Sequence, residues 1–200
     1  MSIINLSNLL KAKGKTHLFI DFDGTLCFLD MDWSGWAKGV ESVLEKFGPN
    51  FEHGLETLDL SELQNQYFER FGKEARDAVT KFTSDYENEH FGGYKLSEQV
   101  LEVVNNDNFV KYLWSSNTRE TVMKILDKEL LSDKFTKIIT RDDVLFVKPN
   151  PYGFNFVYDK VTSFAYDESV SKEKYAMIGD SSIDQEAAKN AGIEFFKVAS

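Results

Sequence analysis

Two aspartates that stand one residue apart follow a short apolar run near the start of the chain. Asp21 and Asp23 lie in residues 21–25, directly after the apolar residues 18–20. Successive side chains of a strand point to opposite sides, so both carboxylates can face one site while Phe22 turns into the core. Two carboxylates about 4 Å apart repel by roughly 4 kcal/mol at an effective dielectric constant of about 20. Because a divalent cation, a shared proton or both must offset that repulsion, the pattern indicates a reaction centre.

An acidic turn is the alternative interpretation of this segment, because Asp and Gly are common in turns. A calcium-binding loop does not fit the spacing. If Gly24 took the sixth position of such a loop, Phe19 would be its first residue and Asp30 its twelfth, and neither end matches. The preceding run is also typical of a strand rather than of a helix.

A pair of serines and an asparagine close a second apolar run, residues 110–114. Ser115, Ser116 and Asn117 stand just before a helix predicted over residues 119–131. A hydroxyl group and backbone N–H groups at the start of a helix can hold an anion. An ordinary helix N-cap is the alternative interpretation.

A lysine between apolar residues and prolines forms the third polar position. Lys148 follows Val147 and precedes Pro149 and Pro151. The prolines limit the local backbone to a few conformations. A lysine fixed in this way suits a site that holds an ionised carboxylate and a phosphate together.

Two further acids follow the apolar run 175–178. Asp180 comes directly after Gly179, and Asp184 falls in the first turn of a helix predicted over residues 184–190. The helix dipole alone favours an acid in a first turn. Two more carboxylates at the end of a strand are, however, the oxygen ligands that a hard cation such as Mg²⁺ requires.

Strands and helices alternate through most of the chain. Short apolar runs predict strands at residues 17–20, 109–114, 138–140, 175–178 and 194–198. The two predicted helices named above lie between them. This alternation predicts an α/β fold with a doubly wound parallel sheet, whose active residues occupy the loops after the strands.

Residues 28–96 break this alternation and are predicted to be all-helical. The predicted helices cover residues 33–47, 61–71 and 74–89, with breaks at 48–50 and 92–93. We therefore predict a helical cap, residues 28–96, inserted after the first strand. The α/β catalytic core would comprise residues 1–27 and 97–200.

Composition excludes several classes of function. The chain has 200 residues, a net charge of −10 and one cysteine, and its pI is about 4.8. Without a basic cluster, such an acidic chain is a poor ligand for nucleic acid. No run of about 20 apolar residues predicts a membrane span, and the start shows no signal-peptide pattern. We expect a cytoplasmic protein, monomeric or homodimeric, with no nucleic-acid or membrane partner.

These motifs, in this order, resemble the haloacid dehalogenase superfamily. The likeness is to its phosphatase branch with a small helical cap, which contains phosphoglycolate phosphatases and β-phosphoglucomutases. It covers residues 15–27 and 100–200. The resemblance implies a phosphatase that acts on a small phosphorylated metabolite through an aspartyl-phosphate. Asp21 would be the nucleophile, and Asp23 the general acid and then the general base.

The same resemblance implies a Mg²⁺ cofactor and a phosphate site. The Asp21 carboxylate, the Asp23 backbone carbonyl and the Asp180 carboxylate would bind the ion, with Asp184 acting behind them or through water. The resemblance implies that the Ser115 hydroxyl and the Ser116 amide bind the phosphoryl group and that Lys148 balances its charge, with Asn117 in the same phosphate site. Because the strand ends in two serines, Ser116 is the alternative for the phosphate-binding hydroxyl.

Alternative functions remain on the same fold. Asp23 argues against dehalogenation, since the dehalogenase lacks an acid at that position. A sugar phosphomutase and a catalytically silent binding protein are the other candidates. We expect Cys27 to pack rather than to react. The cap should set specificity, and its candidate contacts are polar or aromatic side chains: Asp30, Asp32, Trp33, Trp36, Arg70, Arg76 and His90.

Overall fold

The structure is a computed structural model that describes residues 5–48, 59–164 and 170–199. At its centre lies a parallel sheet of five strands in the order β5-β4-β1-β6-β7. These strands are β1 His17–Ile20, β4 Val110–Trp114, β5 Lys137–Ile139, β6 Tyr175–Gly179 and β7 Glu194–Lys197. Each coincides with a predicted strand to within a residue or so.

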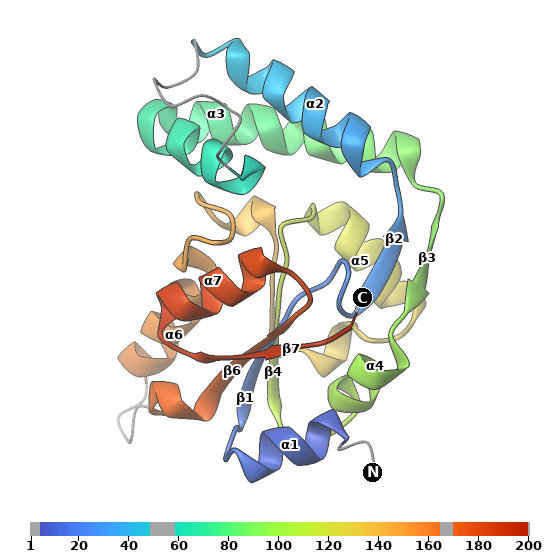
Figure 1. Ribbon diagram of the computed structural model, residues 1–200, viewed down its shortest axis with the longest axis vertical. Coiled ribbons are helices and arrows are strands. Elements are labelled where there is room, and N and C mark those ends of the chain that lie inside the picture. The colour runs from blue at the N-terminus through green and yellow to red at the C-terminus, as the bar shows by residue number, and fades with distance from the viewer. Residues whose placement is uncertain (1–4, 49–58, 165–169, 200) are drawn as a thin grey trace.

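The central strand β1 is buried on both faces of the sheet. Leu18 and Ile20 pack on one side, and Phe19 packs on the other. The first side is covered by α1 Leu6–Ala12, α4 Glu98–Val104 and α5 Arg119–Lys128, and the second by α6 Tyr152–Phe164 and α7 Ser182–Ala191 (Figure 1). The predicted doubly wound α/β sheet is therefore confirmed.

Two long helices lie across the carboxyl ends of the sheet strands (Figure 1). They are α2 Trp33–Glu45 and α3 Leu60–His90. Val40 and Leu44 of α2 are fully covered by Leu63 and Tyr67 of α3 and by their neighbours in a separate apolar cluster. Val40 and Leu44, like Leu63 and Tyr67, are four residues apart, the spacing that puts two side chains on one face of a helix. We call α2 and α3 the cap helices.

A two-stranded antiparallel ribbon connects the cap helices to the core. It consists of β2 Cys27–Asp30 and β3 Gly93–Leu96, with Cys27 opposite Leu96 and Asp30 opposite Gly93. The expectation that residues 28–96 are all-helical is wrong at these two ends. Each strand has four residues, and its partner lies more than sixty positions away, so neither shows a strand pattern by itself. The ribbon lies close to the predicted domain boundaries, which stay a prediction.

The helix α3 bends at a glycine. Gly72 has φ 65° and ψ −147° inside the helix, which is close to the break predicted between residues 71 and 74. Three helices of the structure, α1, α4 and α6, are not among the predicted ones. The first two have seven residues each, too few for a helical repeat to show. Within the described residues, no helix has both the length and the apolarity needed to cross a membrane.

Candidate active site

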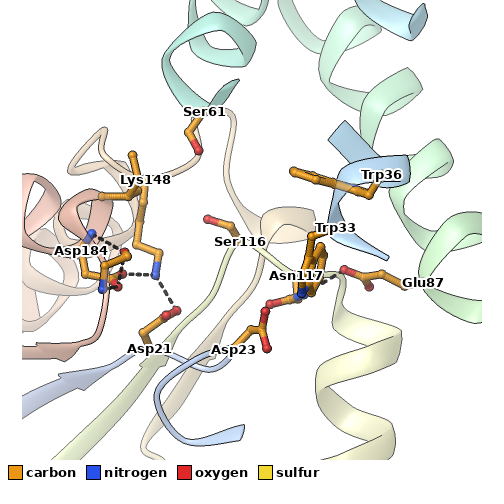
Figure 2. A pocket seen from close by; sticks show the side chains of 12 residues that line it. Asp21, Asp23, Trp33, Trp36, Ser61, Glu87, Ser116, Asn117, Lys148 and Asp184 are labelled. Atoms are coloured by element: carbon orange, nitrogen blue, oxygen red, sulfur yellow. Dashed lines mark hydrogen bonds and ion pairs between the residues drawn. The ribbon is translucent and has the colours of Figure 1, made fainter. Parts of the chain in front are cut away.

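A cavity of about 180 Å³ separates the cap helices from the sheet. Figure 2 shows its side chains. Its lower wall comes from loops of the α/β core: Asp21, Asp23, Ser116, Asn117, Lys148, Ser181, Ile183 and Asp184. We call this set the floor. Its upper wall comes from the cap helices: Trp33, Trp36, Ser61 and Glu87. We call this set the roof.

Asp21 lies at the centre of the floor because it directly follows β1, the central strand of the sheet. Its backbone N–H donates to the Ile178 carbonyl at 3.0 Å, which extends the pairing of β1 with β6 by one residue. Its Oδ1 lies 2.5 Å from Lys148 Nζ, which also lies 2.5 Å from Asp184 Oδ1. All three side chains are nearly inaccessible to solvent. The lysine therefore bridges two carboxylates from different loops, as Figure 2 shows.

Burial makes this charge cluster sensitive to any added cation. Burial raises the pKa of Asp21, Asp184 raises it further, and Lys148 opposes both effects. Burial alone would lower the pKa of Lys148, but Asp184 and Asp21 raise it above its ordinary value. Two acids thus share one ammonium group in a site of low dielectric. A second positive charge beside Asp21 would favour its ionised form.

Asp23 has different surroundings from Asp21. Its Oδ1 accepts a hydrogen bond from the Leu29 N–H at 2.9 Å. Burial, followed by the charges of Asp180 and Glu87, raises the pKa of Asp23 to about 6. Among the described residues, Asp23 makes no ion pair. One acid of the pair is therefore matched with a cation, and the other is set to exchange a proton near neutral pH.

Two carboxylates of the floor and a third beside it form a cluster suited to a hard cation. Ligand atoms of Asp21, Asp180 and Asp184 lie within 4.8 Å of one another. Both oxygens of Asp184 are already engaged, one by Lys148 and the other by the Ser181 hydroxyl at 2.6 Å. Asp180 accepts a hydrogen bond from the Thr25 hydroxyl at 2.8 Å. An all-oxygen set fits Mg²⁺, and Asp184 is the member with least capacity to bind it directly.

Gly24 permits the close approach of the first loop to Asp180. Its φ is +77°, and a Cβ at this position would lie 2.6 Å from Asp180 Oδ2. Both the backbone conformation and the space therefore require glycine. Because Gly24 has no side chain, the loop that carries Asp21 and Asp23 can lie against the Asp180 carboxylate.

The two serines after β4 have different positions. Ser115 continues the sheet, with its N–H donating to the Ile139 carbonyl at 2.9 Å. Its hydroxyl is turned into the loop, where it accepts from the Asn117 N–H and donates to Asn117 Oδ1, each at 3.0 Å. Ser115 does not line the cavity, whereas Ser116 does. Of the two hydroxyls left open by the sequence, the one that faces the cavity is Ser116.

Glu87, a buried carboxylate of the roof, is not among the predicted site residues. Glu87 of α3 accepts hydrogen bonds from Asn117 Nδ2 at 3.0 Å and from the Thr118 N–H at 3.2 Å, and the Thr118 hydroxyl donates to it as well. It is 1% exposed. Glu87 follows Val79 and Thr83 at intervals of four, on the buried face of α3. A charged residue in that register was the signal that could have found it.

The predicted cap contacts divide into two groups. Trp33 and Trp36 line the cavity. The other five candidates do not: Asp30, Asp32, Arg70, Arg76 and His90. Ser61 in the roof and Ser181 and Ile183 in the floor were not singled out.

Further polar contacts join the cap helices to the core, outside the residues that line the cavity. The Asn65 carboxamide of α3 bonds both the N–H and the carbonyl of Val147, at 2.9 and 2.8 Å, next to Lys148. Arg141, which is 2% exposed, donates to Gln64 Oε1 at 2.8 Å and to the Thr83 hydroxyl. The cap helices thus meet the core through bonds that flank the cavity.

A protein-family model and several known proteins match the sequence of this chain. A family model described as haloacid dehalogenase-like hydrolase matches residues 18–198. A phosphoglycolate phosphatase of Aliivibrio fischeri is 27% identical over 113 residues, which cover 54% of this chain and 47% of that protein. A pyrophosphatase, PpaX, of Halalkalibacterium halodurans is 26% identical over 156 residues, covering 78% of this chain and 65% of that protein. The chain therefore spans between about half and two thirds of these relatives.

Solved structures share the fold over most of the chain. A protein reported as a haloacid dehalogenase-like hydrolase from Bacteroides fragilis superposes with a TM-score of 0.57 at 22% identity, covering 92% of this chain and 87% of that one. A superfamily hydrolase of subfamily IA from Geobacter sulfurreducens gives a TM-score of 0.51 at 16% identity, with the same coverage of 92% and 87%. At these identities the likeness concerns the fold alone.

Proposed function

The chain belongs to the haloacid dehalogenase-like hydrolase family, and from this premise we propose that it is a Mg²⁺-dependent phosphatase acting on a small phosphate monoester. One observation carries the proposal. The buried Asp21 carboxylate stands at the end of the central strand, 2.5 Å from Lys148 Nζ, on the wall of the cavity. A carboxylate held next to a fixed ammonium group can attack a phosphoryl group whose charge that ammonium balances.

In the proposed reaction, an oxygen of Asp21 attacks the phosphorus atom, and the bond from phosphorus to the ester oxygen breaks. The leaving alkoxide takes a proton from Asp23, and the phosphoryl group stays on Asp21. Asp23, now ionised, then removes a proton from a water molecule whose oxygen attacks the same phosphorus. The bond to Asp21 breaks, phosphate leaves, and both acids return to their starting states.

Other residues of the floor would hold the phosphoryl oxygens. Ser116 supplies a hydroxyl that faces the cavity, and Lys148 supplies a positive charge. Asn117 would support the loop rather than bind the phosphoryl group directly, because its side chain is engaged by Ser115 and Glu87 and its backbone N–H donates to the Ser115 hydroxyl.

Mg²⁺, when bound, would neutralise the charge that builds up on the transferred group. The Asp21 and Asp180 carboxylates would hold it together with the Asp23 backbone carbonyl. Asp184 would lie behind them and fix Lys148. The support for this assignment is the oxygen-only donor set and the buried excess of acids.

The size of the cavity favours a small metabolite as the substrate. A cavity of about 180 Å³ is little larger than the ~150 Å³ that accommodates benzene. A phosphoryl group with a short leaving group fits this space. The names of the two relatives, a phosphoglycolate phosphatase and a pyrophosphatase, are consistent with a phosphate compound as substrate.

Phosphate release from a panel of small esters tests the proposal. With Mg²⁺, we expect turnover that chelation by EDTA abolishes. The Asp21→Asn variant keeps the size of the side chain but loses the nucleophile, so its turnover should fall by about a thousandfold or more. Circular dichroism would show that it remains folded. Absence of phosphate release from every ester, with Mg²⁺ present, would overturn the proposal. Isomerised sugar phosphate without free phosphate would indicate a phosphomutase.

A further inference from the structure

The roof of the cavity offers no positive charge to a substrate. It consists of two indoles, one hydroxyl and one carboxylate: Trp33, Trp36, Ser61 and Glu87. Within the described lining, Lys148 is the one lysine or arginine, and it already bridges two acids of the floor. The segments that the structure does not describe, residues 1–4, 49–58, 165–169 and 200, contain no lysine or arginine, and His53 is their one basic residue.

The cap helices also present no vacant N-terminus for an anion. Asp32 is the N-cap residue of α2, and its carboxylate accepts a hydrogen bond from the Gly35 N–H at 2.9 Å. Asp59 is the N-cap residue of α3, and its carboxylate accepts a hydrogen bond from the Ser61 N–H at 2.8 Å. The partial positive charge of each helix end is therefore matched by an acid of the chain itself.

The carboxylate of the roof lies close enough to act on whatever occupies the cavity. Glu87 lines the cavity beside Asn117 and is one cause of the raised pKa of Asp23. It accepts three hydrogen bonds, from the Asn117 side chain and from the N–H and hydroxyl of Thr118, which hold it in place at the wall. An anionic group in the upper half of the cavity would face this carboxylate directly, whereas Arg141, the buried cation that interacts with Glu87, does not line the cavity.

The two indoles form an apolar corner next to Glu87. Their ring centroids are 5.7 Å apart and the planes meet at 87°. Trp36 is fixed by a hydrogen bond from its Nε1 to the Thr83 hydroxyl at 3.2 Å. Figure 2 shows Trp33, Trp36 and Glu87 on one side of the cavity and Lys148 and Asp184 on the other. Indole faces attract C–H groups and cations.

From these observations, and resting on the proposed function, we infer that the leaving group of the substrate carries no negative charge. It is a small uncharged or cationic alcohol whose C–H face packs against Trp33 and Trp36. The phosphoryl group lies on the floor beside Lys148, and the leaving group lies in the roof beside Glu87. Esters of hydroxy acids and phosphoanhydrides place a second anion in the roof and are poor substrates.

Four probe esters of similar size test this inference. They are 2-aminoethyl phosphate and glycerol 2-phosphate, whose leaving groups lack a negative charge, and 2-phosphoglycolate and 3-phosphoglycerate, whose leaving groups carry a carboxylate. We expect kcat/KM to favour the first pair by at least about tenfold, because like charges brought together discriminate strongly. Equal or better turnover of 2-phosphoglycolate would overturn the inference.

A charge change in the roof should alter this ratio. Glu87→Gln keeps the shape of the side chain, and we expect it to shift the ratio toward the carboxylate-bearing esters by about tenfold. Glu89→Gln removes the same charge from an exposed site two residues further along α3 and should leave the ratio unchanged. Because the readout is a ratio, a general loss of activity in Glu87→Gln does not obscure it. An unchanged ratio in Glu87→Gln would count against the inference.

Binding separates this inference from the proposed function. Calorimetry with the Asp21→Asn variant and Mg²⁺ ranks the four esters by affinity without turnover. The pair without negative charge should bind more tightly. This order decides the inference even if the wild-type protein releases no phosphate, a result that would count against the proposed function alone.

Discussion

The floor and the roof of the cavity are built in opposite ways. The floor consists of loops at the ends of β1, β4, β5 and β6, and its central side chains form a buried bridge of two carboxylates on one lysine. The roof consists of side chains along two helices, and it is mainly aromatic. The floor is positioned by the strands of the sheet. The cap helices that carry the roof are joined to the core by side-chain hydrogen bonds of Asn65, Glu87 and Gln64.

This difference separates two tasks. Under the proposed function, the floor would transfer the phosphoryl group, which is the same in every ester. The roof would contact the leaving group, which differs from one ester to the next. Substitutions in the floor should therefore affect every substrate and the stability of the fold, while substitutions in the roof should affect the choice of substrate.

The largest expected effect is the loss of the bridging lysine. Lys148→Met leaves Asp21 and Asp184 buried without a cation, so the free energy of unfolding should fall by about 3–5 kcal/mol. Turnover of every ester should be lost. Urea denaturation at pH 7 measures the first effect. Lys81→Met, which removes an exposed lysine paired only with Asp85, should change stability by less than about 0.5 kcal/mol. Equal stability of the two variants would contradict a charged bridge.

A smaller loss is expected at the contact between roof and core. Arg141→Met removes the donors to Gln64 and Thr83, which are buried on α3. Hydrogen bonds to a charged group contribute about 1.5–3 kcal/mol, so we expect a destabilisation in this range. Thermal unfolding measures it. A loss below about 0.5 kcal/mol would show that these bonds contribute little to holding the cap helices on the core.

A still smaller effect, on the Mg²⁺ requirement, is expected when Gly24 is replaced. Gly24→Ala would place a Cβ 2.6 Å from Asp180 Oδ2, so Asp180 must move. We expect the Mg²⁺ concentration needed for half-maximal turnover to rise by about 10- to 100-fold. Gly192→Ala is the matched control. Its φ is +73°, but its nearest atoms lie 3.8 Å away. That variant should lose about 1–2 kcal/mol of stability through backbone strain alone, with an unchanged Mg²⁺ requirement.

The smallest effect is expected within the aromatic corner. Trp36→Phe keeps an aromatic face but loses the hydrogen bond to Thr83, which contributes about 0.5–1.5 kcal/mol. We expect KM for 2-aminoethyl phosphate to rise by less than about fivefold, with kcat unchanged. Trp36→Ala, which removes the face, should raise KM more. Similar KM values for the two variants would argue against packing of the leaving group on this ring.

The sequence was more informative about the floor than about the roof. The family and the α/β fold are confirmed, because motifs at strand ends and an alternation of elements are local patterns. The predicted residues Asp21, Asp23, Lys148 and Asp184 line one cavity although they are far apart in the chain. Parallel strands explain this result, since their carboxyl ends meet at one edge of the sheet.

The missed features depend on contacts that the sequence does not display. Whether Ser115 or Ser116 faces the cavity depends on one extra sheet bond, from the Ser115 N–H to Ile139. Glu87 has its partners at positions 117 and 118, and its role follows only from how α3 lies over β4. The ribbon strands β2 and β3 stabilise each other across the whole cap.

The ribbon also contains a natural reporter. Cys27 lies at the start of β2, is fully buried, and is the one cysteine of the 200 residues. Burial raises the pKa of its thiol to about 12, so the closed protein should react very slowly with thiol reagents. Labelling would then require the ribbon to separate from the core, and its rate would measure how often that happens. A single wild-type side chain could thus report local opening at the junction of ribbon and core, without any engineered label.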